Sequence, residues 1–176
     1  MTQTKTTGLK QATMNILNGI GMGVIASLVP AAILGQLMKA LLGVAPAFAQ
    51  TVINITTFTQ SLLAAMAGFC AAYLFQLNMV QMSSVAAAAM IGSGAVTFKN
   101  GLMTVAGTGD VINIGLTITV AIFLVKLIGK RLGSYTALLL PIIIVVGGGG
   151  IGLLLLPYVK TVTTLIGTIV MAFTKL

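Results

Sequence analysis

The sequence predicts an all-α membrane protein, a polytopic bundle of about six transmembrane helices with broken or re-entrant elements. Hydrophobic residues make up 58% of the 176-residue chain and charged residues only 6%, whereas a soluble domain has roughly 25% charged residues. The mean hydropathy is +1.15. The apolar residues gather in long segments with brief connections, so we expect residues 1–176 to form a single integral membrane domain.

A transmembrane helix needs about 20 mostly apolar residues to cross about 30 Å of hydrocarbon, and the chain offers six candidate segments. They are residues 14–42, 61–77, 80–98, 111–128, 135–156 and, the shortest, 161–173. The first contains Pro30, whose missing N–H predicts a kink or break. Its apolar region exceeds the about 7 to 15 residues of a signal peptide, so we expect it to be retained as a helix.

Two other segments fit poorly as plain spans. Residues 44–60, "VAPAFAQTVINITTFTQ", mix polar and apolar side chains, which favours an interfacial helix or a loop leading into the membrane. Residues 99–110 are rich in glycine and polar groups, and such backbone is tolerated at membrane depth only where protein or a water-filled cavity satisfies it. A re-entrant or unwound element is therefore expected there.

The nine Lys and Arg residues predict a cytoplasmic N-terminus. In that orientation six cations lie inside and three outside, as the positive-inside rule favours. The inside set is Lys5, Lys10, Lys126, Lys130, Arg131 and Lys175, and the outside set is Lys39, Lys99 and Lys160.

Glycines are concentrated inside the predicted spans, most of all at Gly147–Gly150 and Gly152 between Pro141 and Pro157. One interpretation is close packing of helices through small residues. The other is a discontinuous helix that lines a solute site, as in many transporters. A weak internal echo, with Gly23 and Gly150 each seven residues before a proline, supports the second. Its hinge residues would be Pro30, Gly92, Gly94, Gly107, Gly109, Gly147, Gly150 and Pro157.

The composition also excludes several classes of function. The chain has no histidine, one cysteine (Cys70) and one acidic residue, so no catalytic triad, carboxylate pair or metal-binding cluster can form. We therefore expect no enzymatic activity, no catalytic residue, no metal and no cofactor. The cations are scattered singly without interleaved aromatic residues, which argues against nucleic-acid binding.

Four stretches, in order along most of the chain, carry a family resemblance. They are "LNGIGMGVIASLVPAAILGQLMK" at 17–39, "IGSGA" at 91–95, "GTGDVIN" at 107–113 and "LPIIIVVGGGGIGLLLLPYV" at 139–159. Together they resemble the phosphotransferase-system (PTS) IIC-type permeases, with this chain similar to the N-terminal half. The resemblance implies a multi-pass carrier in the bacterial cell membrane that moves a sugar and works with cytoplasmic PTS components.

Asp110, the only acidic residue, precedes the apolar run that starts at Val111. It is predicted to cap this helix by accepting backbone N–H groups. A second, compatible interpretation places Asp110 and Asn113, one turn apart, at the lip of a polar cavity that binds a hydroxylated solute or a cation. The other candidate residues are Lys99 as charge partner, Asn100, Thr108, and Asn18 in the family-like "NG" pair.

Two functions remain open at this stage. The first is a transporter module whose solute site is walled by the broken first helix, residues 91–113 and the Gly-rich fifth segment. Such a module would work as a homodimer or with a complementary second half, because six spans can hardly enclose a solute. The second is a non-transporting membrane protein on the same scaffold, which binds lipid or a hydrophobic ligand or acts as a sensor.

Overall fold

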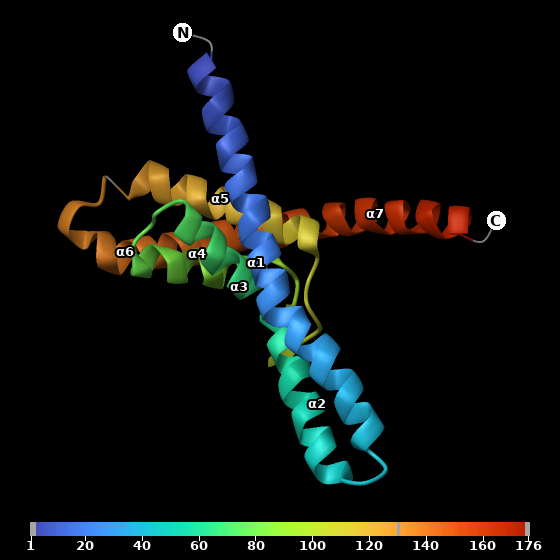
Figure 1. The fold of residues 1–176 in the computed structure, drawn as a ribbon. Coiled ribbons are helices and arrows are strands. Elements are labelled where there is room, and N and C mark those ends of the chain that lie inside the picture. The colour runs from blue at the N-terminus through green and yellow to red at the C-terminus, as the bar shows by residue number, and fades with distance from the viewer. Residues whose placement is uncertain (1–2, 130, 175–176) are drawn as a thin grey trace.

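Helices dominate the computed structural model, which describes residues 3–129 and 131–174 (Figure 1). The predicted all-α class is confirmed. The helical elements are α1 (Gln3–Leu41), α2 (Pro46–Ser61), α3 (Leu63–Leu74), α4 (Met79–Gly92), α5 (Val111–Ile128), η1 (Gly133–Tyr135), α6 (Thr136–Ile143), the π-helical η2 (Ile144–Gly148) and α7 (Gly149–Thr174). A hairpin of β1 (Val96–Lys99) and β2 (Leu102–Val105) lies between α4 and α5.

The described residues contain three helical segments long and apolar enough to span a membrane: Gly8–Leu41, Val111–Ile128 and Thr136–Thr174. A fourth is added if α2 and α3, which meet at a 48° bend, count as one span, and α4 is a shorter apolar helix. About six spans were expected because segments such as 135–156 and 161–173 were counted separately, whereas the structure joins these two in one helical segment. Only the predicted span 111–128 has the same bounds in the structure.

The predicted break at Pro30 does not occur, because α1 continues through it to Leu41. Neighbouring helices support α1 on both sides of the proline. Its N-terminal part packs on α3, where Gly19 and Gly23 lie against the backbone of Ala71 and Ala67. Its C-terminal part packs on α2 (Figure 1). Residues 44–60, expected as an interfacial helix or a loop, therefore form mainly the helix of an α1–α2 hairpin.

The region expected as the end of one span and a re-entrant element forms the β-hairpin instead. The span predicted over 80–98 ends at Gly92, and Val96–Val105 form two antiparallel strands. Asn100 and Gly101 form the turn with φ values of 52° and 76°. Asn-Gly favours this left-handed two-residue turn, and the flanking Val, Thr and Phe residues favour strands.

The Gly-rich fifth segment is not discontinuous in the structure. The helix widens into a π-helical turn at Ile144–Gly148 and then continues as α7 through Pro157, so the predicted fifth and sixth spans form one helix. Some of its glycines serve close packing: Gly148 lies against Ala121 of α5, and Gly149 against Ile91 of α4. The interpretation as a helix contact surface is therefore confirmed.

The buried core lies where α3, α4 and α5 meet, and seven of its sixteen described residues are alanines. Ala67, Ala71, Ala88, Ala89 and Ala121 are fully buried there. Small side chains let the helix backbones approach closely. From Thr161 onward α7 projects from this core, and every described residue except Gly167 is exposed (Figure 1).

Candidate functional site

Asp110 begins α5 and caps it as the sequence predicts. Its backbone is extended (φ −89°, ψ 120°), and its Oδ1 accepts a hydrogen bond of 3.0 Å from the backbone N–H of Asn113. The Asp110 N–H in turn donates to the carbonyl oxygen of Ser93 at 2.9 Å. Asp110 therefore joins the start of α5 to the residues that follow α4. Its negative charge also complements the positive end of the α5 dipole.

The second carboxylate oxygen of Asp110 is used by a residue that the sequence analysis did not select. The hydroxyl of Thr163 on α7 donates to Asp110 Oδ2 at 2.9 Å, across 53 residues of sequence. The same hydroxyl also contacts the Val159 carbonyl oxygen at 3.0 Å. Asp110 thus tethers the start of α5 to α7 at the point where α7 leaves the core.

Asn113 lies in the protein interior and not at the lip of a cavity, so its predicted placement is corrected. Its side chain is 0% exposed, and Nδ2 donates to the carbonyl oxygens of Gly92 on α4 and Gly152 on α7, the latter at 2.8 Å. Among the described residues its Oδ1 has no hydrogen-bond partner. The one-turn spacing from Asp110 did not place both side chains together, because Asp110 is an extended capping residue and Asn113 is helical.

The helices that Asn113 connects cross with almost no space between them. Gly92 and Gly152 face each other with the Thr117 side chain against both. A Cβ atom at Gly152 would lie 2.7 Å from the Gly92 Cα. The Thr117 hydroxyl donates to the Asn113 carbonyl oxygen at 2.8 Å, so its polar group is satisfied inside the contact. Gly92, expected as a hinge, is therefore a tight packing position.

A polar cavity of 380 Å³ lies above this crossing, between the end of α4, the loop before α5 and α7. It is lined by Ser93, Gly94, Ala106, Gly107, Thr108, Gly109, Asp110 and Lys160. Gly94, Gly107 and Gly109 have left-handed φ values of 73°, 111° and 81°. The loop can therefore follow the cavity wall where other residues would be strained.

The structure brings together part of the predicted site. Asp110 and Thr108 line the cavity with Gly94, Gly107 and Gly109, which were expected as hinges. Asn100 lies at the hairpin turn and Asn18 on an exposed face of α1, so neither belongs to the cavity. The side chain of Lys99 lies outside the described residues. No wall of the cavity comes from α1, contrary to the expected arrangement.

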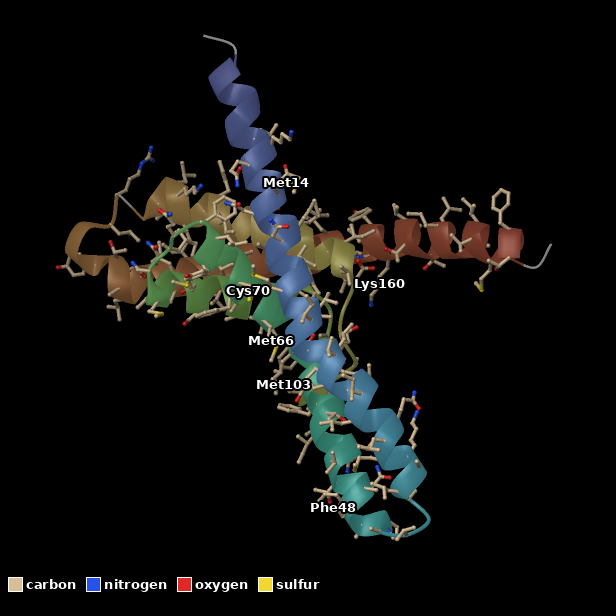
Figure 2. All side chains as sticks on the ribbon, viewed as in Figure 1. Met14, Phe48, Met66, Cys70, Met103 and Lys160 are labelled. Carbon is tan, nitrogen blue, oxygen red and sulfur yellow. The ribbon has the colours of Figure 1, made fainter. Side chains whose placement is uncertain are left out.

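The sequence analysis did not select two polar residues of the cavity, Ser93 and Lys160. Lys160 was missed because it was assigned to an external loop between two spans. In the structure it lies within the long helix Thr136–Thr174, next to the start of α5 (Figure 2). A lone cation in an apolar helix is a signal that could have identified it, since ionisable residues at membrane depth usually have a function.

Capping predicts different outcomes for two substitutions of Asp110. Asp110→Ala removes the acceptor for the Asn113 N–H, and we expect it to lower the free energy of unfolding by about 1 kcal/mol. Asp110→Asn keeps an acceptor and should change stability by only a few tenths of a kcal/mol. Thermal unfolding of the detergent-solubilised variants, followed by circular dichroism at 222 nm, measures both. Equal losses would show that the negative charge, and not the capping bond, is what matters.

A second cavity, whose wall includes both strands of the hairpin, is apolar. This groove of 830 Å³ lies between α2, α4, the β-hairpin and α7. Its lining side chains include Phe58, Leu62, Met90, Phe98, Met103 and Leu156. Phe98 and Met103 face each other across the hairpin register. Its lining suits acyl chains or other apolar groups.

Comparison with known proteins gives one match. The model of a protein family described as "Phosphotransferase system, EIIC" matches residues 14–176. No curated protein and no solved structure matches the chain. The matched region contains every residue of the polar cavity and of the helix crossing beneath it.

Proposed function

We propose that this chain, which belongs to the EIIC family of the phosphotransferase system, moves a small hydroxylated solute across the bacterial cell membrane. Members of this family are multi-pass membrane proteins and transport components of the PTS. The N-terminus lies in the cytoplasm in this proposal. Its partners are cytoplasmic PTS components, which receive the solute, and the lipids around it. The residues that contact the solute line the polar cavity above the Gly92–Gly152 crossing.

One observation carries the proposal: a cavity with largely polar walls in a chain that exposes many large hydrophobic side chains. Asp110, Thr108, Ser93 and Lys160 converge there from three parts of the fold. A carboxylate, hydroxyl groups and an ammonium group together can hydrogen-bond the hydroxyls of a solute in both directions. Polar groups placed on irregular backbone between helices are the usual construction of transporter sites.

The proposed site needs a further wall, because α7 borders the cavity and the part of α7 beyond it is bare. Thr161–Thr174 project from the core with apolar side chains such as Leu165, Ile169 and Phe173 exposed. We propose that a second copy of the chain, or a complementary second half, packs here. The inferred assembly closes the cavity and permits access from alternate sides.

Blocking the cavity tests the proposed solute site. Thr108→Phe places a large ring at the cavity wall, and we expect it to lower solute exchange by at least about tenfold, since one misplaced group can cost about 100-fold in a positioned site. Exchange is measured in proteoliposomes with labelled hexoses, hexitols and their acidic derivatives, which requires no phosphorylating partner. Thr57→Phe, at an exposed position of α2 outside both cavities, is the matched control and should leave exchange unchanged. Equal exchange in both variants would remove the cavity from the transport route.

The apolar groove supports a second candidate function, the binding of a lipid or hydrophobic ligand without transport. Its lining is almost wholly apolar, and it is larger than the polar cavity, at 830 Å³ against 380 Å³. Native mass spectrometry of the protein in mild detergent distinguishes the two. A retained apolar ligand, together with no exchange of any solute in proteoliposomes, would favour the second function over the first.

A further inference from the structure

The loop that lines the polar cavity carries hydrogen-bond donors without partners. On either side of it the backbone is satisfied: the Ala106 N–H donates to the Ala95 carbonyl oxygen at 2.7 Å, and the Asp110 N–H donates to Ser93. Between them, the N–H groups of Gly107, Thr108 and Gly109 donate to no residue that the structure describes. Left-handed φ values at Gly107 and Gly109 flank Thr108. Successive N–H groups in such a backbone form concavities that bind anions.

An exposed cation without an ionic partner borders the cavity. Lys160 lines it, and within residues 3–129 and 131–174 no carboxylate lies within salt-bridge distance of its ammonium group. Asp110 is the only acidic side chain in the sequence. Both of its oxygens already accept hydrogen bonds, from the Asn113 N–H and the Thr163 hydroxyl. Three N–H groups and one ammonium group therefore line the cavity as donors with no acceptor assigned to them.

From this excess of donors we infer that the cavity binds an anionic group, a carboxylate or a phosphate, with Lys160 as the residue that sets this specificity. The inference rests on the proposed function and narrows its solute to a hydroxylated anion. The anionic group pairs with Lys160 and the N–H groups of 107–109, and the neighbouring hydroxyls of the solute reach Asp110 and Thr108. The Asp110 charge opposes the anion, which keeps binding weak enough for release.

Paired probes that differ only in charge test the inference. They are gluconate against sorbitol and glucose 6-phosphate against glucose, each titrated calorimetrically into the whole protein in phosphatidylcholine nanodiscs. We expect at least one anion to bind about 10- to 100-fold more tightly than its neutral counterpart, the range for a hydrogen bond to a charged group. Lys160→Met should abolish this difference and Lys160→Arg should keep it. Lys39→Met removes an exposed cation at the end of α1 and should have no effect.

A phosphate group can also come from a lipid, so the titrations are repeated in phosphatidylglycerol nanodiscs. A loss of gluconate and glucose 6-phosphate binding in these discs, with Lys160-dependent retention of phosphatidylglycerol in native mass spectra, assigns the anion site to a lipid headgroup. Unchanged binding in both discs assigns it to a soluble solute. Both results support an anion site at Lys160.

Two results would overturn the inference, and they have different consequences for the proposed function. If neutral and anionic probes bind equally in wild type and Lys160→Met, the anion preference is wrong while the solute site stands. If no probe binds and the retention of no lipid depends on Lys160, the anion site is wrong. Solute exchange by the Thr108→Phe variant in proteoliposomes then tests the solute site separately.

Discussion

Gly152→Ala will lower the free energy of unfolding by about 1–3 kcal/mol, the usual effect of overpacking a tight contact. The added Cβ meets the Gly92 Cα at 2.7 Å and the Thr117 side chain. Neither neighbour can move away easily, because one is backbone and the other is a β-branched side chain held by its bond to Asn113. Larger substitutions such as Gly152→Val should prevent accumulation of folded protein.

Gly150→Ala is the matched control on the same helix. A Cβ at Gly150 meets nothing within 4 Å, so the substitution adds helix propensity without a clash. We expect it to leave stability unchanged or raise it by up to about 1 kcal/mol. Thermal unfolding in detergent, followed by circular dichroism, compares the two variants under one condition. Equal stability of Gly150→Ala and Gly152→Ala would show that α4, α5 and α7 do not cross as described.

Asn113→Leu keeps a similar side-chain volume and should destabilise the helix crossing. It removes the two interhelical hydrogen bonds to the Gly92 and Gly152 carbonyl oxygens. The Gly152 carbonyl lies inside α7 and keeps its intrahelical bond, whereas the Gly92 carbonyl ends α4 and is left buried without this partner. Leaving a buried polar group unpaired costs about 1–3 kcal/mol, although bonds between membrane helices average nearer 0.6 kcal/mol. We therefore expect a loss of about 2 kcal/mol.

The control for Asn113→Leu is Asn18→Leu, at an exposed position of α1. Exposed substitutions usually change stability by less than about 0.5 kcal/mol. Both variants are measured by the same unfolding experiment, with exchange in proteoliposomes as a second readout. A stable, fully active Asn113→Leu protein would mean that close packing alone holds the crossing together.

The crossing and the cavity are linked through the chain. Gly92 is followed directly by Ser93 and Gly94, which line the cavity, and Gly152 lies two helical turns before Lys160 on α7. The position of Lys160 relative to Asp110 therefore depends on how α7 crosses α4 and α5. We expect variants of the crossing to weaken solute binding even where the protein still folds.

The fold class, the span 111–128 and the helix cap at Asp110 could be predicted from the sequence, because each depends on residues that are close together in the chain. A continuous apolar run sets the α5 bounds of Val111–Ile128, and an acidic residue directly before it accepts the free N–H groups of the first turn. The local sequence also indicates the hairpin, because the Asn100-Gly101 pair lies between β-branched and aromatic residues. The glycine and polar residues of 99–110 instead led to the wrong expectation of a re-entrant element.

The tertiary structure alone decided the composition of the site. The Thr163–Asp110 and Asn113–Gly152 bonds join residues 53 and 39 positions apart, and nothing in the spacing of those residues indicates the pairing. Small residues permit close helix contact at many registers, so the sequence left open which glycine meets which helix. In the folded protein Gly92 packs against Gly152. In this arrangement of the helices Asn113 is buried and Lys160 lies at the cavity.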